Sequence, residues 1–488
     1  MEPIQIPPVD LKLLAPLLIV VGWATALLLI DTFLIPAGQK KITGYLALAG
    51  MLVAALAGIP LWNVGGSTFS GMIVLDPFSL TMTWIFLLTG ALSVAMALDY
   101  LPRHGIEQGE FYPLMMFAVA GMIVMAQGTD MIVLFLGVEA LSITLYILTG
   151  FAYPRQASEE AAMKYLVLGA FAAGFFVYGI ALIYGATGTT SLAGIAAAMS
   201  QPAFLAEGRT LMLAGSGMVL IAFSFKAALA PFHMWTPDVY EGSPTPVAAF
   251  MSVGTKGAAL AALLRILTLA LAPMHAFWLP VLVALAAVTM VVGNLGAFAQ
   301  TNVKRMLAYS SVGHAGYILM GIMVASERGT QAFLFYMVSY ALTNLGAFAV
   351  LIALEQRGEA AWSLDDFSGL YQRRPWLAIA MAVFMFSLAG VPPTAGFIAK
   401  FYVFTAAYEG GLGGLALVGV ITSAIAAFFY LRVVLRMFMQ EPVRDLRPEL
   451  GDGLTVDIIV AGVLTLLIGL LPTPVVVLVE RSLVVLGG

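Results

Sequence analysis

The sequence of 488 residues predicts an all-α polytopic membrane protein. Hydrophobic residues make up 61% of the chain and charged residues only 10%, and the mean hydropathy is +0.99. A soluble domain has about 25% charged residues, so this chain lacks the polar residues to cover a water-facing surface. Its apolar residues form continuous runs rather than alternating with polar ones, which favours membrane-spanning helices over a β-barrel.

Fourteen apolar runs are long enough to cross a bilayer as helices, which takes about 20 residues each. They lie near 13–33, 44–62, 78–98, 111–127, 130–150, 161–184, 209–230, 244–271, 278–299, 305–325, 330–354, 375–408, 412–439 and 455–479. The two longest connections, near 185–208 and 355–374, are too short to fold as domains. We therefore expect about 14 transmembrane helices in a single transmembrane domain over 1–488.

Basic residues outside the runs are concentrated on one side of the predicted bundle. The connections after odd-numbered runs contain Lys40, Lys41, Arg103, Arg155, Lys164, Lys304, Arg305, Arg357, Arg373, Arg374, Arg432, Arg436, Arg444 and Arg447, whereas the opposite side contains Lys12, Arg209, Arg328 and Arg481. The positive-inside rule places the larger group in the cytoplasm. Because the number of spans is even, both termini are predicted to lie on the outer side. The N-terminal "MEPIQIPPVD" lacks the basic residues of a cleaved signal peptide.

Four charged residues lie near the middles of predicted spans: Glu139, Lys226, Lys256 and Lys400. A lysine at a helix centre costs roughly 3 kcal/mol on insertion scales, so such residues usually face a partner or a water-filled cavity. For any single one, a structural ion pair or snorkelling is an equal alternative, but the four together favour a functional site. Arg265 lies nearer the end of its run, where we expect it to snorkel.

Prolines predict breaks in helices 7 and 12. Pro231 cannot donate a backbone hydrogen bond, which frees the carbonyl of Ala227. The pair Pro392 and Pro393 does the same to the carbonyls four residues earlier. Freed backbone at membrane depth is tolerated where it is buried or lines a hydrated cavity, so broken helices in paired positions point to a transport site.

The five-segment spacing of these breaks suggests two five-helix repeats, and an odd number of spans makes their topologies inverted. The first repeat, helices 4–8, covers 111–271, and the second, helices 9–13, covers 278–439. Helices 1–3 precede them within 1–110, and helix 14 follows at 455–479.

Buried lysines near a carboxylate have the chemistry of a proton relay. Desolvation disfavours the ammonium form, and a nearby carboxylate favours it again. A lysine whose distance from Glu139 changes can therefore take up and release a proton. Polar residues that would support such a relay are His233, Tyr309, Ser310, Ser311 and His314, although each alone more often serves helix packing.

Charges near the predicted cytoplasmic side are interpreted differently. Lys164 follows Glu160 by one helical turn, so it forms either an interfacial i,i+4 pair or part of a water chain. Asp238 and Glu241 follow the break at Pro231. We interpret them as loop and capping residues on the cytoplasmic connection rather than as members of the relay.

The sequence predicts no cofactor and no metal site in this chain. It contains no cysteine, which excludes disulfides, thiolate-bound iron–sulfur clusters and c-type haem attachment. Of the histidines, only His233 and His314 fall within the membrane-embedded part, which disfavours a bis-histidine haem. No glycine-rich dinucleotide fingerprint follows a predicted strand.

Four segments make the sequence recognisable: "SEEAAMKYLVLGAF" (158–171), "FKAALAPFHMWTPDVYEGSPTPVAAFMSVGTK" (225–256), "VKRMLAYSSVGHAGY" (303–317) and "PPTAGFIAKFYVF" (392–404). On these segments the chain resembles the antiporter-like membrane subunits of respiratory complex I, the proton-pumping NADH–quinone oxidoreductase, over nearly its whole length. The stretch "PDVYEGSPTPV" favours the subunit N branch of this family. Lys400 favours subunit N as well, because the resemblance implies a glutamate at this position in subunit M. Subunit L is disfavoured for another reason, because the resemblance implies a long C-terminal lateral helix in it.

The resemblance implies proton translocation driven by quinone reduction elsewhere in a complex of the bacterial inner membrane, with both termini periplasmic. It implies that Glu139 and Lys226 form a charged pair, that Lys256 is the central relay and that Lys400 is the terminal proton site. Lys164 and His233 would modulate the proton path. Flavin, iron–sulfur clusters and quinone would be bound by other membrane subunits and the peripheral arm. The implied partners are these subunits and the lipid bilayer, with no nucleic acid.

Two alternatives stay open from the sequence. The first is a subunit of a multi-subunit sodium/proton antiporter, which shares the same ancestry. The second is a structural membrane scaffold whose buried charges only hold helices together.

Overall fold

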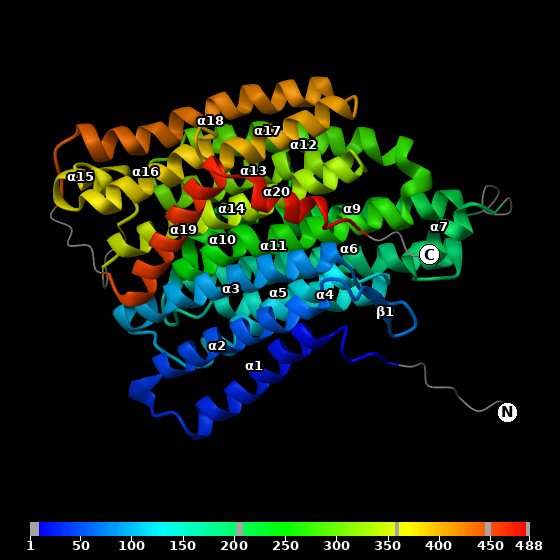
Figure 1. Cartoon of the computed structure of the whole chain (residues 1–488), viewed down its shortest axis with the longest axis horizontal. Helices are drawn as coiled ribbons and strands as arrows, with labels where there is room; N and C mark the ends of the chain where they lie inside the picture. The colour runs from blue at the N-terminus through cyan, green and yellow to red at the C-terminus, as the bar shows by residue number, and fades with distance from the viewer. Residues whose placement is uncertain (1–8, 202–207, 357–360, 445–449, 485–488) are drawn as a thin grey trace.

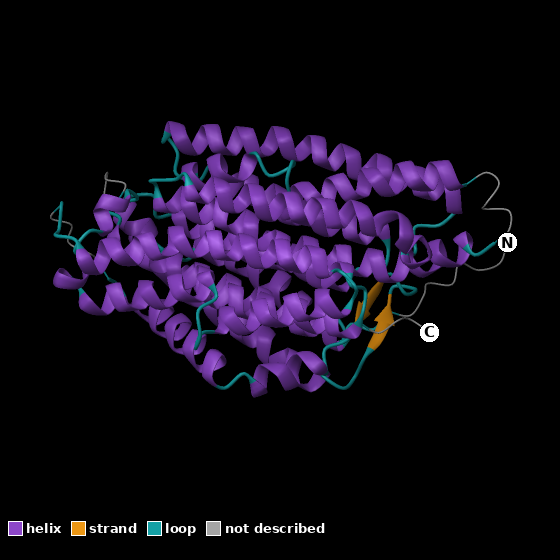
Figure 2. Cartoon of the chain, turned by 90° about the horizontal axis from the view of Figure 1, so that it is seen from above, coloured by secondary structure: helices purple, strands orange, loops and turns teal. Residues whose placement is uncertain are grey.

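The computed structural model describes residues 9–201, 208–356, 361–444 and 450–484, which form one elongated bundle of helices (Figures 1 and 2). Each of the fourteen expected ranges overlaps a helix or a pair of helices. By length and composition, 11 helices in the described part could cross a membrane, and two shorter apolar helices accompany them. The all-α membrane fold is therefore confirmed, whereas the count of fourteen spans stays a prediction. Arg357 and Arg447 lie outside the described residues.

The first half of the chain contains the helices α1 (Ala15–Phe33), α2 (Lys41–Gly58), α3 (Pro77–His104), α4 (Phe111–Gln127), α5 (Met131–Thr149), α6 (Gln156–Thr187), α7 (Leu192–Met199), α9 (Arg209–Ala227), α10 (Trp235–Gly242) and α11 (Thr245–Arg265). A short antiparallel hairpin, β1 (Gly66–Thr68) and β2 (Ile73–Leu75), precedes α3. Neither the hairpin nor α7 was expected. The Ser191 side chain caps α7 by accepting a hydrogen bond from the Gly194 backbone, which explains a helix in that connection.

The second half contains α12 (His275–Phe298), α13 (Val303–Met323), α14 (Glu327–Leu354), α15 (Leu370–Arg373), α16 (Pro375–Ala389), α17 (Ala395–Glu409), α18 (Gly413–Met439), α19 (Asp452–Leu470) and α20 (Thr473–Glu480). Single turns of 3₁₀ or π-helix lie at Ala37–Gln39, Ile59–Leu61, Ile266–Ala270, Ala272–Met274 and Leu364–Phe367. The last expected span, 455–479, is divided between α19 and α20 because Pro472 ends the helical hydrogen bonding there.

The helix α9 ends at Ala227, four residues before Pro231. Ala228 adopts the left-handed conformation with φ 57°, and its N–H bonds back to the carbonyls of Phe225 and Ser224, which closes the helix early. Helical structure resumes with α10 at Trp235. Likewise α16 ends at Ala389, followed by left-handed Gly390, and α17 begins at Ala395.

The two ends of the bundle differ. Figure 1 shows the hairpin and α7 at one end and α15 at the other. We call the first the hairpin end; backbone bridges join Ile73 to Gly128 and Asp130 to Ser191 there. We call the second the basic end; it carries Arg103, Arg155, Lys304 and Arg305.

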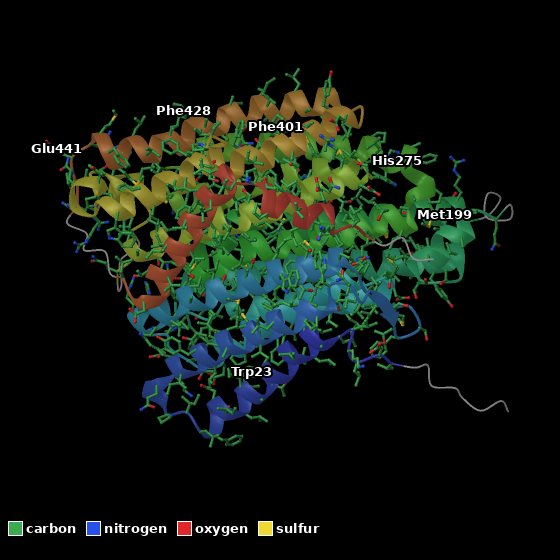
Figure 3. All side chains as sticks on the ribbon, viewed as in Figure 1. Trp23, Met199, His275, Phe401, Phe428 and Glu441 are labelled. Atoms are coloured by element: carbon green, nitrogen blue, oxygen red, sulfur yellow. The ribbon has the colours of Figure 1, made fainter. Side chains whose placement is uncertain are left out.

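The helices α11 and α14 form the centre of the bundle. The apolar window of α11 is 100% buried and that of α14 is 94% buried, against 33% for α1 and 39% for α18. Peripheral helices instead project apolar side chains outward, as Phe401 and Phe428 do in Figure 3. Polar residues on α11 and α14 therefore face protein rather than lipid, and their partners must come from neighbouring helices.

Arg265 was expected to snorkel toward water, but at the end of α11 it does not. It is fully buried, with its Nη2 2.6 Å from Asp76 Oδ1 and its Nε donating to the carbonyl of Ala126 at 2.6 Å. Its guanidinium lies 5.2 Å from the centre of the Phe78 ring. The helices α3 and α4 cover this end of α11, so the side chain meets a carboxylate rather than water.

Replacing Asp76 with alanine should destabilise the protein by about 3–5 kcal/mol, because it leaves the buried Arg265 charge without its carboxylate. It also removes the capping box of α3. The temperature at which the detergent-solubilised protein aggregates would measure the loss. Asp452→Ala, which removes an exposed aspartate in the first turn of α19, is the matched control and should change that temperature little. Equal stability of the two variants would contradict this role for Asp76.

Candidate functional site

Glu139 on α5 and Lys226 in the last turn of α9 interact electrostatically but form no ion pair within 4.0 Å in the described structure. Lys226 is 4% exposed, and its Nζ lies 5.5, 5.3 and 5.8 Å from the ring centres of Tyr146, Tyr165 and Phe225. Neither this Nζ nor Glu139 Oε1 has a hydrogen-bond partner among the described residues. The pair can therefore approach or separate without breaking other hydrogen bonds.

Further polar groups lie near Lys226 in the chain, on α9, on α10 and in the segment between them. His233 Nδ1, Thr236 Oγ1 and Ser224 Oγ are buried atoms without a hydrogen-bond partner among the described residues. The indole of Trp235, the first residue of α10, donates to the carbonyl of Phe225 at 3.1 Å, and the same carbonyl accepts a bond from the Ala228 N–H. Lys226 also borders a cavity of about 10 Å³ between α5, α6 and α9.

Lys256 lies fully buried on α11, and its Nζ donates to the hydroxyl of Tyr240 at 2.9 Å. Tyr240 belongs to α10, the helix that follows the break. Tyr240 was not expected from the sequence, although it stands in the quoted motif, because nothing in the spacing distinguishes a lysine partner from a core aromatic residue.

His314 on α13 lies in a cluster of tyrosine hydroxyls. Its Nδ1 is 2.7 Å from the hydroxyl of Tyr336, and its Nε2 is 3.1 Å from that of Tyr430. Tyr430 also hydrogen-bonds Ser310, and the ring of Tyr340 stacks on the imidazole at 4.8 Å. The structure thus joins two expected residues, Ser310 and His314, through tyrosines of α14 and α18 that the sequence analysis did not single out.

Lys400 on α17 occupies the gap that follows α16. Its Nζ donates to the carbonyls of Leu388 at 2.8 Å and Ala389 at 3.0 Å, and to Ser423 Oγ at 2.8 Å. These are the two carbonyls that the proline pair was expected to free. The ammonium also lies 5.2 Å from the centre of the Tyr317 ring. The ammonium group therefore replaces the missing backbone donors, which explains a stable charge at this depth.

The charges of both Lys256 and Lys400 act on the imidazole of His314. Two further residues expected to support the relay, Tyr309 and Ser311, lie on the same helix as His314. Tyr309 is half-buried and packs its ring against Gly296 on α12. Ser311 Oγ donates to the carbonyl of Ala308 on its own helix at 2.7 Å, and its hydroxyl also interacts with the phenols of Tyr240 and Tyr340.

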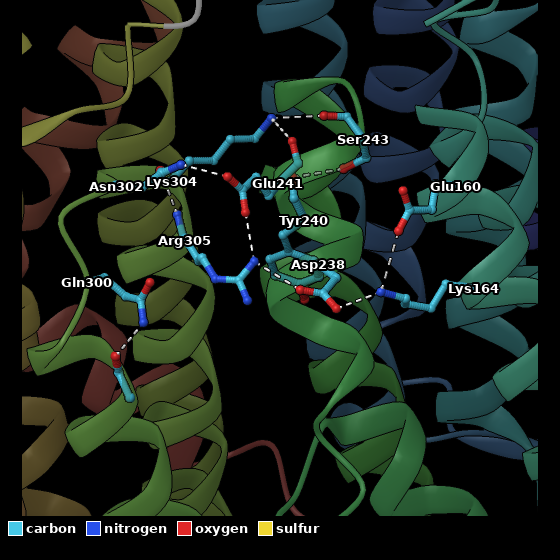
Figure 4. Close-up of polar contacts among 11 residues, drawn as sticks. Glu160, Lys164, Asp238, Tyr240, Glu241, Ser243, Gln300, Asn302, Lys304 and Arg305 are labelled. Carbon is cyan, nitrogen blue, oxygen red and sulfur yellow. Dashed lines mark hydrogen bonds and ion pairs between the residues drawn. The ribbon is translucent and has the colours of Figure 1, made fainter. Parts of the chain in front are cut away.

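The sequence predicted Asp238 and Glu241 in a loop, but both lie on α10. There they form an ion-pair network with neighbouring helices (Figure 4). Lys164 Nζ is 2.7 Å from Asp238 Oδ2 and 3.9 Å from Glu160 Oε1, so its main partner is Asp238. Arg305 Nη1 is 2.9 Å from Asp238 Oδ1 and 2.7 Å from Glu241 Oε2. The network connects α6 to α13 through α10.

Comparison with known proteins gives concordant matches. Residues 128–426 match the family described as NADH:quinone oxidoreductase/Mrp antiporter, TM. NADH-quinone oxidoreductase subunit N of Chloroflexus aggregans is 72% identical over 489 residues, covering 100% of both chains. NADH-quinone oxidoreductase subunit N 2 of Roseiflexus castenholzii is 56% identical over 495 residues, covering 100% of this chain and 99% of the relative.

Solved structures show the same fold. A chain of respiratory complex I from Thermus thermophilus with bound aureothin is 37% identical, with a TM-score of 0.80 over 94% of this chain and 98% of that chain. A chain of the Mrp complex from Dietzia has a TM-score of 0.83 over 97% of both chains, but its identity of 23% supports the fold alone. The resemblance expected from the motifs is thus confirmed, and the chain belongs to the NADH-quinone oxidoreductase subunit N family.

Proposed function

We propose that this chain is a proton-translocating, non-redox membrane subunit of NADH:quinone oxidoreductase, in which quinone reduction in other subunits drives protons along its buried charges. One observation carries the proposal. Lys226, Lys256 and Lys400 lie buried in one bundle, and His314 interacts with the last two of them. Buried charges are expensive in a membrane. Among the described residues, neither Lys256 nor Lys400 has a carboxylate within 4.0 Å; their hydrogen-bond partners are hydroxyl groups and backbone carbonyls.

The proposed transfer begins at the Glu139 and Lys226 pair. When Glu139 lies close, its carboxylate stabilises the ammonium of Lys226; when the two separate, the ammonium loses that stabilisation and releases its proton toward Lys256. Lys256 accepts it as a neutral amine and holds it beside the Tyr240 hydroxyl. The proton then passes through the His314 and tyrosine cluster to Lys400, the proposed terminal site.

The proposal extends to the surroundings of the chain. Its partners are the other membrane subunits and the peripheral arm of complex I, in a bacterial inner membrane, with flavin, iron–sulfur clusters and quinone bound by those subunits. The basic end faces the cytoplasm and both termini face the periplasm, in keeping with the positive-inside rule. The gaps after α9 and α16 would mark equivalent positions in two inverted repeats.

The test is Lys226→Ala and Glu139→Gln in the assembled complex, with proton pumping measured in vesicles during NADH oxidation. Each variant should lower pumping by about tenfold or more, because each removes one partner of the acid–base pair. Lys41→Ala, an exposed lysine at the start of α2, is the control and should pump normally. Normal pumping by both Lys226→Ala and Glu139→Gln would sink the relay assignment.

The same experiment separates the two alternatives. A scaffold role predicts that neutral variants reduce the amount of assembled complex and leave pumping per complex unchanged. A sodium/proton antiporter subunit would not copurify with flavin and iron–sulfur subunits, so the composition of the purified complex decides that case.

A further inference from the structure

A cavity of about 550 Å³ opens at the basic end of the bundle. It lies where α3 and α14 end and where the chain turns after α5. Its lining includes Tyr100, His104, Arg155, Glu355 and Trp362. The side chain of His104 is 15% exposed and that of Glu355 only 2%, so the imidazole lies toward the opening and the carboxylate lies deeper.

The orientation of His104 is set by Tyr100 one turn earlier on α3. His104 Nδ1 is 2.9 Å from the backbone carbonyl of Tyr100, and the two rings stack at 4.0 Å. A carbonyl oxygen can only accept, so Nδ1 carries the proton of the neutral ring. The unprotonated Nε2 therefore faces Glu355 Oε2 at 3.8 Å. Oε2 of Glu355 is therefore the acceptor that faces a proton bound at Nε2 of His104.

Glu355 is held by its other oxygen. Oε1 accepts hydrogen bonds from Thr245 Oγ1 at 2.7 Å and from the indole of Trp362 at 2.6 Å. The charged groups around it are His104, Arg103, Arg155 and Lys304, together with the phenol of Tyr100. Thr245 is the first residue of α11, the helix that bears Lys256, so the carboxylate is bonded directly to the relay helix.

A row of polar residues on α11 and α14 extends from Glu355 toward the middle of the bundle. On α11, Thr245, Ser252 and Lys256 share one face, because intervals of seven and eleven residues are close to whole turns of an α-helix. Asn344 lies on α14, and Glu355 is the extended residue that directly follows the last residue of that helix.

The two faces meet. Besides the bond between Thr245 and Glu355, Asn344 Nδ2 on α14 donates to Ser252 Oγ on α11. Both contacts are buried, and they join antiparallel helices at the centre of the bundle. We call this line of Glu355, Thr245, Asn344, Ser252 and Lys256 the polar seam. It covers twelve residues of α11, a rise of about 16 Å, from the cavity to Lys256.

We propose that His104 and Glu355 form the proton uptake site for Lys256, connected to it by the polar seam. A proton from water in the cavity binds Nε2 of His104 and passes to Oε2 of Glu355, which returns the imidazole to its neutral form. The proton then follows the seam to the neutral amine of Lys256, which becomes an ammonium. This inference rests on the proposed proton translocation and adds a second source of protons for Lys256, besides Lys226.

The test uses the assembled complex in vesicles, with proton pumping measured during NADH oxidation. His104→Ala should lower pumping by about tenfold. Imidazole added on the side of the basic end should restore most of that loss. Pyrazole, which has the same shape but is far less basic, should not restore it. Glu355→Gln, which keeps an oxygen for Thr245 and Trp362, should lower pumping by a similar factor and should not respond to imidazole.

Asp366→Asn is the matched control, because Asp366 is another buried carboxylate at the basic end, bonded instead to Arg444. It should pump normally. Wild-type pumping by His104→Ala or Glu355→Gln would overturn the inference, and so would equal rescue by pyrazole and imidazole. If Lys226 and Glu139 variants also pump normally, the proposed function fails as well; if they do not, only the uptake site is wrong.

Discussion

Replacing Lys256 with methionine is expected to lower proton pumping by the assembled complex by about 100-fold or more. Lys256 is fully buried, and its Nζ contacts the Tyr240 hydroxyl at the point where the polar seam reaches the relay. Methionine has a similar length but cannot bind a proton, so protons from either direction would stop at this position. The measurement is the number of protons pumped per NADH oxidised, in vesicles that contain the purified complex.

The fold should survive this change. A buried ammonium contributes little net stability, and an apolar side chain of similar volume commonly replaces a buried charge without loss. Lys41→Met, in which the lysine is exposed, is the control for the loss of one positive charge. If Lys256→Met pumped at more than half the wild-type rate, Lys256 could not be the central carrier.

Replacing Lys400 with methionine should both stop pumping and destabilise the chain. Its ammonium donates to the carbonyls of Leu388 and Ala389 and to Ser423. Each carbonyl left buried without a donor costs about 1–3 kcal/mol. The aggregation temperature of Lys400→Met should therefore fall clearly below that of Lys256→Met, whose lysine has one hydroxyl partner.

The two methionine variants are matched controls for each other, because both remove one buried ammonium. Lys400→Arg should recover part of the stability, since a guanidinium can also donate to the carbonyls. Equal aggregation temperatures for Lys256→Met and Lys400→Met would contradict the structural role of Lys400 at the gap between α16 and α17.

The sequence was sufficient to find the charged residues of the candidate site, because a lysine within an apolar run stands out against its neighbours. Their partners were not visible in it. Tyr240, Tyr336 and Tyr430 lie in helices that are already rich in aromatic residues, and helix packing alone decides which of them meets Lys256 or His314. Hydrophobic periodicity specifies that a helix is buried but not which neighbour its hydroxyl faces.

Two predictions were wrong for a common reason. Arg265 was expected to reach water, and Asp238 and Glu241 were expected in a loop. The positions of Arg265, Asp238 and Glu241 depend on where the helices end and on which neighbouring helices cover those ends. The helix α9 ends four residues before its proline, and α10 resumes soon enough to include Asp238 and Glu241. Left-handed Ala228 sets that early end, and alanine has no sequence preference that would reveal it.

The ion-pair network on α10 has a mechanical consequence. Asp238 and Glu241 hold this eight-residue helix to Lys164 on one side and Arg305 on the other, and Tyr240 stands between them in the chain. The helix has only about two turns, and a non-helical segment separates it from α9. A displacement of α6 or α13 at the basic end therefore shifts the phenol that touches Lys256. The helix α10 thus couples the charged network mechanically to Lys256, because the same short helix carries Asp238, Glu241 and the phenol that contacts the lysine.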